Sequence, residues 1–407
     1  MRNFRYKALC VAMLAATAST ASVTAHAQSS VTMYGIMSAD VDYANHAFGG
    51  SHIFKFNDSM ATANRWGLRG TEDLGNGLQA IFTLEGGFAL SNGSMAQGGT
   101  IFGRQIFVGL HKNKVGQVTF GRQYSFNEDF LTQYSTGANT PAVNFAYHMS
   151  DVDQMANSRI NNAVKFTSDP FYGVQFGGLY GFSNTPGDMG GNNFQTVHSG
   201  GTRTYSAGVK YDYGTFGIGA AIMDTKNPYS GIYTGTSGQS TFTSLSIGGI
   251  SPATAVADLR SFGIGAHYSF GPAMVWALWT NTSIESGTAS TSTPTETFNV
   301  FEVGGKYNFT PAIYAGVGYS YQLLHNGQDE GGSAHWHQVT LTGDYAFSKR
   351  TDAYILGAYQ SASGKIGNQC AQASVGDSNS NTSGYYGLSG ECGLNQVAIA
   401  IGIRHKF

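Results

Sequence analysis

The side chains in this sequence whose types and spacing most clearly suggest a function are basic residues that alternate with apolar ones. Arg65 and Arg69 alternate with Trp66 and Leu68. Successive side chains of a strand point to opposite faces, so an outward Trp66 and Leu68 place both arginines inside. A later segment has apolar Ile160, Val164 and Phe166, and between them Arg159, Asn161 and Lys165. We therefore expect four basic side chains on the inner surface of one sheet.

A basic surface of this kind would act through its electric field rather than through proton transfer. A guanidinium group keeps its charge in proteins, and like charges held on a rigid wall set a strong local field. Rings of such charges select ions. The alternative is that each arginine pairs with a carboxylate such as Glu85 and braces the wall. The two roles are compatible, and we expect no cofactor and no metal.

Four carboxylates could oppose the basic surface, and all lie in the long segment 125–156: Glu128, Asp129, Asp151 and Asp153. Charged residues of long connecting segments are equally often solvated on an outer surface. The sequence leaves both interpretations open.

Two histidines, His335 and His337, share one face of a strand and could bind a metal or act as bases. A catalytic metal site needs further ligands at defined geometry. No third ligand, nucleophile elbow, phosphate loop or HExxH motif accompanies them. We therefore favour two histidines at a membrane interface over an enzyme site.

The composition of the chain excludes several classes of protein. Of 407 residues only 11% are charged, 13% are aromatic and 56 are glycine. So many aromatic residues exclude a disordered chain. The 22 basic and 24 acidic residues form no basic stripe, which argues against nucleic acid as a partner.

The N-terminus and the cysteines both indicate export. Residues 1–27 combine a basic head, a short apolar run and Ala25-His26-Ala27, as in a cleaved signal peptide, which leaves 28–407 as one domain. Beyond this segment the cysteines are Cys370 and Cys392, which an oxidising compartment would join as a disulfide. Two free thiols are the alternative.

The elements that must position these residues are strands with period two. The last one places Val397, Ile399, Ile401 and Ile403 on one face and small or polar residues on the other. Short turns are expected at 74–77, 112–116, 169–173, 270–272, 308–311 and 348–351, and at Gly214. Long loops are expected near 45–61, 89–100, 125–156, 184–201, 227–257, 285–295, 325–334 and 363–393. Eight hairpins predict an all-β, 16-stranded antiparallel transmembrane barrel, with short periplasmic turns, long extracellular loops and a water-filled lumen. Unpaired backbone is costly in lipid, so the strand that ends at Phe407 should pair with the one that begins near Val31.

Several motifs occur in an informative order: Ser30-Val31-Thr32-Met33-Tyr34-Gly35, the run from Arg65 to Leu78, Phe102-Gly103-Arg104-Gln105, Phe120-Gly121-Arg122-Gln123-Tyr124 and the terminal Phe407. Together they resemble the general diffusion porins of the Gram-negative outer membrane, especially the beta-proteobacterial branch. The resemblance implies a homotrimeric passive pore for ions and small hydrophilic solutes in the outer-membrane lipid.

The resemblance also implies roles for particular residues. The third long loop, 125–156, would fold into the lumen as a constriction opposite a basic wall, with Arg104 inward and Arg122 as a weaker member. Parity alone fits Arg104 badly, because Ile106 and Val108 follow it. The terminal strand with Phe407 would be read by the outer-membrane assembly machinery. In place of the Pro-Glu-Phe-Gly-Gly of enterobacterial loops this chain has Gly137-Ala138-Asn139-Thr140-Pro141, so the facing carboxylates stay open.

Selectivity follows from the balance of these charges. More basic than acidic residues map to the wall, which favours a weak anion preference. A substrate-specific porin and a surface adhesin remain alternatives, together with the outer-membrane enzyme, and the sequence does not separate the first two from a general pore.

Overall fold

The strands of this protein form a barrel in the computed structural model, which describes residues 29–156, 158–182, 203–226, 245–253, 256–286, 295–327, 332–376 and 386–407. The predicted signal peptide at 1–27 lies outside the described residues. In chain order the strands are β1 (Ser30–Ala47), β2 (Ser51–Asp58), β3 (Arg65–Gly75), β4 (Leu78–Gly87), β5 (Gln105–Lys112), β6 (Gly116–Tyr124), β7 (Arg159–Ser168), β8 (Val174–Gly181), β9 (Arg203–Tyr213), β10 (Phe216–Lys226), β11 (Leu245–Ile247), β12 (Ile250–Ala253), β13 (Val256–Phe270), β14 (Ala273–Ser286), β15 (Thr295–Thr310), β16 (Ile313–His325), β17 (Ser333–Ala346), β18 (Thr351–Ile366), β19 (Gln369–Cys370) and β20 (Asn395–Lys406).

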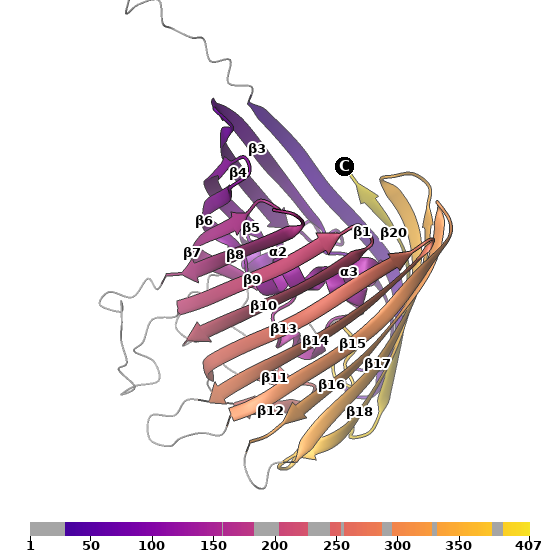
Figure 1. Cartoon of the computed structure of the whole chain (residues 1–407). Helices are drawn as coiled ribbons and strands as arrows, with labels where there is room; N and C mark the ends of the chain where they lie inside the picture. Colours follow the sequence, from indigo (N-terminus) through magenta and orange to yellow (C-terminus); the bar gives the residue numbers. More distant parts are fainter. Residues whose placement is uncertain are drawn as a thin grey trace, which may run out of the picture.

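These strands close into a 16-stranded antiparallel barrel, which confirms the predicted fold (Figure 1). Two members of the large sheet add no further barrel strand, because β19 only pairs with the end of β18 and β2 continues the line of β3 alongside β1. A separate pair, β11 and β12, lies outside the large sheet.

Closure joins the two ends of the barrel as expected. Strand β1 pairs with β20 from Ile36 opposite Lys406 to Ala44 opposite Ala398. The main chains of Gly35 and Phe407 also exchange two hydrogen bonds, of 3.1 and 3.0 Å. No sheet edge between these strands is left unpaired, as lipid requires.

The strands run further than predicted on the long-loop side. The segment predicted as a loop near 45–61 contains the end of β1 and all of β2, whose Phe54 and Phe56 are exposed on the outside. The alternation continues through this segment, and the backbone pairing continues with it. Likewise β11 and β12 fall within the predicted loop 227–257, and β19 within 363–393.

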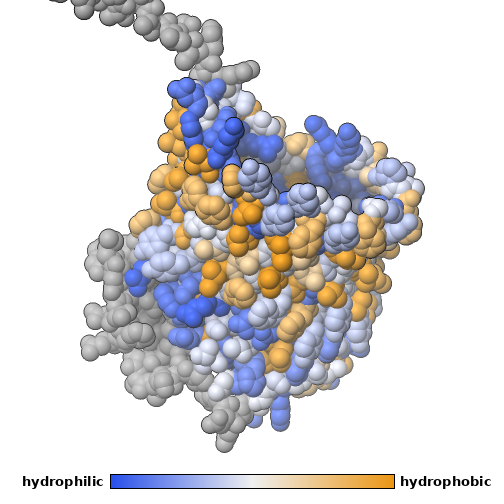
Figure 2. All heavy atoms as spheres, in the orientation of Figure 1, coloured by the Kyte–Doolittle hydropathy of each residue, from blue (hydrophilic) through white to orange (hydrophobic). Residues whose placement is uncertain are grey.

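The outer wall is apolar and its short-turn end is aromatic. Figure 2 shows a hydrophobic band across the barrel between hydrophilic ends. Exposed aromatic side chains gather where strands enter the short turns: Tyr213, Phe270, Tyr307, Phe309, Tyr345 and Phe347. This is the girdle expected at a membrane interface. Within the described residues, no helix has both the length and the apolar character needed to cross a bilayer.

The helical elements are short: α2 (Ala96–Gly99), the π-helix η1 (Asn127–Leu131), the 3-10 helix η2 (Thr132–Tyr134), α3 (Thr136–Asn139) and the 3-10 helix η3 (Met149–Asp151). All except α2 belong to the connection between β6 and β7, and Figure 1 shows α3 within the barrel. This connection, residues 125–158, is called the inner loop below.

Candidate functional site: a basic wall facing an inner loop

The inner loop fits inside the barrel because glycines on β8, β13 and β16 leave room for its side chains. Phe126 packs on Gly177, where an added Cβ would come within 2.2 Å of the ring. Tyr134 occupies the same kind of space over Gly265, at 2.7 Å, and Thr136 over Gly318, at 2.1 Å. These distances leave no room for any side chain at the three glycines. Part of the high glycine content of the sequence thus serves to accommodate this loop, and Gly177, Gly265 and Gly318 are together called the glycine bed below.

Hydrogen bonds fasten the inner loop along several strands. The amide N–H of Met149 donates to Gln322 Oε1 on β16 at 2.6 Å. Gln338 on β17 donates to the carbonyl of Phe145 at 2.7 Å. Thr136 receives the indole N–H of Trp276 on its hydroxyl at 3.2 Å. These contacts fix the loop to the wall over β14 to β17.

A buried histidine, His148, is the strongest of these attachments. Its Nδ1 lies 2.6 Å from Asp153 Oδ2, and its Nε2 lies 2.7 Å from Glu302 Oε2 on β15. Burial alone would lower the pKa of His148, but the two carboxylates hold it well above its ordinary value. Asp153 also accepts from Thr280 Oγ1 at 2.7 Å. The sequence reasoning missed His148, which stands in a loop without any motif.

This arrangement corrects part of the predicted set of counter-charges. Asp153 is fully buried against β14 and β15 and does not oppose the arginines. Asp151 accepts the backbone N–H groups of Met155 and Ala156 at 3.1 and 2.9 Å, so it organises the end of the loop. Asp153 is therefore an attachment of the loop to the wall. Asp151 also contributes to raising the pKa of Glu128, which lies near Arg104 and Arg159, so its place among the counter-charges stays a prediction.

The other two predicted carboxylates lie beside basic side chains. Asp129 forms an ion pair with Lys165 of β7. Burial raises the pKa of Glu128 to about 8, while the nearby charges of Arg159 and Arg104 act in the opposite direction. These two acids therefore belong to the site.

The basic side chains form a wall over β3 to β7, which we call the basic wall: Arg65, Arg69, Arg104, Arg122, Arg159 and Lys165. Glu85 of β4 lies at its centre. Its carboxylate accepts Arg104 Nε at 2.7 Å and Tyr34 Oη at 3.0 Å, and lies 3.9 Å from Arg65 Nε. One carboxylate thus braces two arginines and neutralises only one of them.

Aromatic rings support three of the cations. The guanidinium of Arg69 lies 5.5 Å from the ring centre of Tyr34, and that of Arg159 lies 5.2 Å from the ring centre of Tyr124. Lys165 lies 4.6 Å from the ring centre of Phe126. Cation–π contacts hold charge in place without cancelling it. Both tyrosines stand in the sequence motifs described above, but nothing there indicates this role.

Two members of the basic wall break the simple alternation, for local reasons. Ile106 and Val108 are exposed on the outer face of β5, yet Arg104 is buried, because it precedes the strand. Arg122 lies at a register shift between Gly121 and Gln123, and its Nε donates to the carbonyl of Gly103 at 2.9 Å. Irregular backbone at these points turns both guanidinium groups away from lipid.

The same irregularity corrects the expected direction of Ile160. This residue pairs with Gln123 across the register shift and is fully buried in an apolar cluster with Phe126 and Leu179. It does not face lipid. Arg159 beside it nonetheless joins the basic wall, where Nε lies 3.2 Å from Tyr124 Oη.

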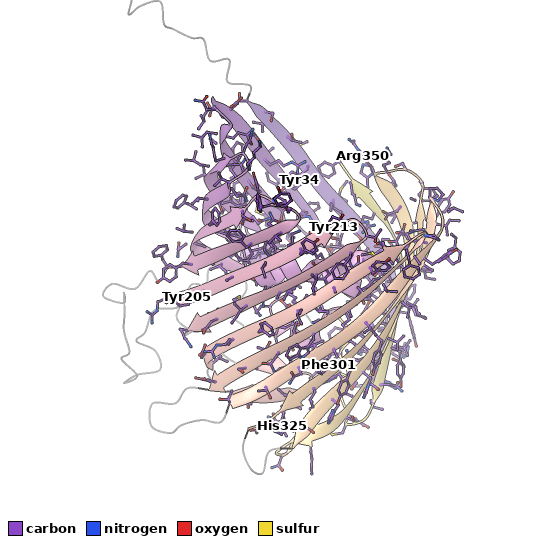
Figure 3. The ribbon with its side chains drawn as sticks, viewed as in Figure 1. Tyr34, Tyr205, Tyr213, Phe301, His325 and Arg350 are labelled. Carbon is purple, nitrogen blue, oxygen red and sulfur yellow. A yellow bond between two sulfur atoms is a disulfide. The ribbon has the colours of Figure 1, made fainter. Side chains whose placement is uncertain are left out.

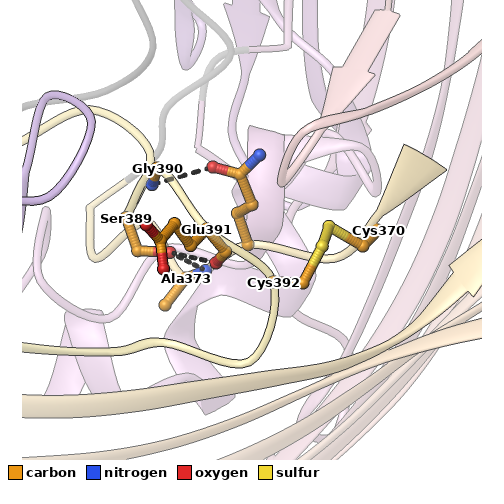
Figure 4. Close-up of a disulfide and its surroundings, with 7 residues drawn as sticks. Cys370, Ala373, Ser389, Gly390, Glu391 and Cys392 are labelled. Atoms are coloured by element: carbon orange, nitrogen blue, oxygen red, sulfur yellow. Dashed lines mark hydrogen bonds between the residues drawn. A yellow bond between two sulfur atoms is a disulfide. The ribbon is translucent and has the colours of Figure 1, made fainter.

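The long connection between β18 and β20 also reaches inward. A disulfide joins Cys370 to Cys392, with their Cα atoms 5.6 Å apart (Figure 4). Between the two cysteines, Tyr386 donates its hydroxyl hydrogen to Asp42 Oδ2 at 2.7 Å, and its ring lies beside that of Phe145 in the inner loop, with ring centres 6.1 Å apart. The connection therefore touches the inner loop and β1 together.

The two histidines considered as an enzyme site lie on the outer wall and contact hydroxyl groups. His337 Nδ1 lies 2.8 Å from Tyr319 Oη, and His335 Nδ1 lies 2.7 Å from Tyr321 Oη. Among the residues that the structure describes, no three histidine, cysteine, aspartate or glutamate side chains gather as a metal site would require.

Comparison with known proteins agrees with this architecture. The Gram-negative porin family matches residues 11–365. An outer membrane porin protein of Bordetella pertussis is 35% identical over 211 residues, 48% of this chain and 54% of that protein. Outer membrane porin protein 32 of Delftia acidovorans is 33% identical over 218 residues, 53% of this chain and 59% of that protein. The chain thus spans somewhat more than half the length of these curated relatives.

A solved structure gives the same fold over a longer stretch. The anion-selective porin from Comamonas acidovorans superposes with a TM-score of 0.68 at 24% identity, covering 93% of this chain and all of that one. OmpT of Vibrio cholerae matches with a TM-score of 0.62 at 13% identity, covering 94% of this chain and all of the other. The family match over most of the sequence, together with the closed barrel, shows that this chain belongs to the Gram-negative porin family and resides in the outer membrane.

Proposed function

We propose that the chain forms a passive, water-filled channel for ions and small hydrophilic solutes, with a weak preference for anions. The observation that carries this proposal is the charge of the basic wall. Its six cations outnumber the four nearby carboxylates, Glu85, Glu128, Asp129 and Asp151, so the wall keeps a net positive charge. Rings of fixed charge bias ion passage in this way. The likeness to the Comamonas porin, which is anion-selective, supports the same sign.

The inner loop supports the idea of a constriction. It rests on the glycine bed, Gly177 of β8, Gly265 of β13 and Gly318 of β16, and it brings Glu128 and Asp129 to the basic wall. Solutes would pass between the two, where the field of the arginines is strongest. The residues proposed for this role are the basic wall with Glu85, Glu128 and Asp129.

Two further parts of the proposal concern partners. The homotrimer implied by the resemblance accords with the trimer form in which OmpT of Vibrio cholerae has been solved. The terminal Phe407, bonded to Gly35 at the closing seam, fits a role as the signal for the outer-membrane assembly machinery. Three equal conductance steps per insertion would support the trimer, and single steps would contradict it.

Recording in planar lipid bilayers tests the channel itself. The purified protein should give ohmic steps, and a tenfold KCl gradient should give a reversal potential of the sign expected for chloride. A cation-selective potential that stays unchanged when Arg65, Arg69 and Arg159 are replaced by glutamine would contradict the anion preference. Absence of any conductance from folded barrels would contradict the channel.

A further inference from the structure

On one side of the barrel the inner faces of the strands are apolar at the long-loop end, which is the reverse of a wall that borders water. On β15 Phe298 and Val300 are fully buried, while Asn299 between them is partly exposed on the outer face. The buried pair shares its face with Glu302, which contacts His148 of the inner loop, so it points into the barrel. Neighbouring strands add further buried side chains to the same cluster: Leu324, Ala334, Trp336, Ala362 and Ile366. Apolar surface of this extent is costly to leave in water, so other parts of the chain must cover it.

Two connections cover this wall from inside. They are the hairpin β11–β12 and the two described parts of the connection between β18 and β20, residues 371–376 and 386–392, which together are called the cap. Figure 1 shows β11 and β12 near the long-loop end of the barrel. At Gly248 of the hairpin an added Cβ would lie 2.6 Å from the indole of Trp336, so the hairpin turn rests directly on this ring. Four buried side chains of the cap belong to the same apolar cluster as Trp336: Ile247, Ile250, Ala371 and Ala373.

Gln372 joins the two connections of the cap. Its backbone N–H donates to the carbonyl of Gly248 at 2.8 Å, and its own carbonyl accepts the indole N–H of Trp336 at 2.9 Å. Its side-chain Oε1 accepts the N–H of Gly390 at 2.9 Å (Figure 4). The disulfide lies two residues from Gln372 along one part of the connection and two residues from Gly390 along the other. It therefore fastens both parts of the connection beside the bonds that hold the hairpin.

The wall beneath the cap differs in charge from the basic wall. From the level of Glu302 to the long-loop end, none of the described inward residues of β14 to β18 is basic, and Glu296 is a buried acid. Glu302 itself is paired with His148. An ion that passed along this side would meet no fixed cation and one carboxylate.

We propose that the cap is a second selectivity element, which confines the passage to the basic wall, and that reduction of its disulfide opens a route with weaker anion preference. This inference rests on the proposed channel function. Cys392 is exposed and Cys370 partly so, which lets a dithiol in solution reach the bond. The dithiol supplies two electrons and two protons: its own sulfurs form a new S–S bond, while the bond between Cys370 Sγ and Cys392 Sγ breaks to give two thiols.

Iodide quenching of Trp336 fluorescence tests the cap without any ionic current. Trp66→Phe and Trp279→Phe remove the two partly exposed indoles, and Trp276 stays buried against Thr136 of the inner loop. Iodide should leave Trp336 unquenched in the oxidised protein, because the ring is fully buried. Dithiothreitol opens the closed loop and should raise the population with a detached cap about a hundredfold, which increases the quenching.

Single-channel recordings with dithiothreitol on the long-loop side test the route. The oxidised channel should visit a higher conductance level rarely, and reduction should raise the occupancy of that level about a hundredfold. The chloride-to-potassium ratio should be lower in that level. Cys370→Ser with Cys392→Ser should match the reduced channel and show no response to dithiothreitol.

A glycine variant opens the cap with the disulfide intact. Gly248→Val places a side chain where the Trp336 indole lies, so it should increase both the iodide quenching and the occupancy of the higher level. Gly271→Val is the matched control, since Gly271 has a similar positive φ, 57° against 52°, but nothing within 4 Å of its added Cβ. Its quenching and conductance should match the wild type.

Three results would overturn the proposal and leave the channel function intact. The first is equal protection of Trp336 before and after reduction. The second is an exposed Trp336 with unchanged conductance and reversal potential, because the uncovered side would then carry no route. The third is a response to dithiothreitol that persists without the two cysteines. Absence of conductance from folded protein in every arm would instead contradict the channel and, with it, the proposal.

Discussion

Replacement of Arg69 by glutamine should measure how strongly a single charge of the basic wall acts on passing ions. Arg69 is exposed, contacts the face of Tyr34, and forms no ion pair among the described residues. Its replacement therefore removes one uncompensated positive charge with little loss of packing. Replacement of Arg104 would be harder to interpret, because it would also leave the buried Glu85 without its closest partner.

The size of the effect follows from Coulomb's law. An ion that passes about 6 Å from one guanidinium in water interacts with it by about 0.7 kcal/mol. Screening over a Debye length of about 10 Å at 0.1 M salt reduces this to about 0.4 kcal/mol. Anion and cation shift in opposite directions, so their permeability ratio changes by about 0.8 kcal/mol, or about fourfold.

Reversal potentials in a tenfold KCl gradient provide the assay. Arg69→Gln should lower the chloride-to-potassium ratio about fourfold at 0.1 M, and the change should shrink at 1 M salt. Arg350→Gln is the matched control, since Arg350 is exposed in the turn between β17 and β18, at the barrel rim (Figure 3). If Arg69→Gln shifts the ratio no more than Arg350→Gln does, the field of the basic wall does not govern selectivity.

Three other predictions concern the inner loop and the disulfide. The pKa of Glu128 is raised to about 8, so this side chain gains negative charge as the pH rises through 8. The preference of the channel for anions should therefore weaken from pH 6 to pH 9. Glu128→Gln should abolish this change in reversal potential. His148→Gln should destabilise the inner loop by about 3 kcal/mol or more, because the buried carboxylates of Glu302 and Asp153 lose their ion-pair partner, and amide hydrogen exchange in the loop should quicken accordingly. The disulfide Cys370–Cys392 joins residues with a sequence separation of 22, and a closed loop of this length stabilises the folded connection by about 3 kcal/mol. Reduction should therefore accelerate proteolytic cleavage between the cysteines by about a hundredfold.

Each of these predictions has its own control. The raised pKa of His148 means that its stabilisation is complete below the ordinary pKa of about 6.5 and is lost only as pH rises through the raised value. The difference in loop stability between wild type and His148→Gln should therefore be largest near pH 6. A difference that grows with pH would contradict stabilisation by the ion pairs of His148 with Asp153 and Glu302. Glu128→Asp should retain the pH response, and Cys370→Ser with Cys392→Ser should cleave rapidly without reductant.

The barrel could be predicted from the sequence because each strand has lipid on one face and the water-filled interior on the other. Val397, Ile399 and Ile401 must face lipid, and residues between them must not, so a period of two extends over the whole segment. The strand count, the closing pair β1–β20 and the inner position of Arg65 and Arg69 all follow from that alternation. It fails where the pairing register shifts, as at Ile160, because a one-residue irregularity exchanges the faces of a strand.

The path of the inner loop could not be predicted in the same way. No alternation governs a loop, and its position depends on space left by glycines on distant strands, such as Gly177 on β8 and Gly318 on β16. A sequence shows those glycines but not which loop side chain will fill the space above them. The role of Asp153 depended on that path, and this is why one of the four predicted counter-charges proved to be an attachment of the loop.

The structure also relates the two interpretations of the arginines that the sequence left open. If each arginine had its own carboxylate, the ion pairs that hold the arginines in place would also cancel their charge. Glu85, however, is shared by Arg65 and Arg104. The shared carboxylate holds both guanidinium groups in place while one positive charge remains, and the ring of Tyr34 holds Arg69 without cancelling its charge. A rigid wall therefore keeps its net charge. Because much of the inner loop is bound along β13 to β17, we expect the proposed passage to run along the basic wall.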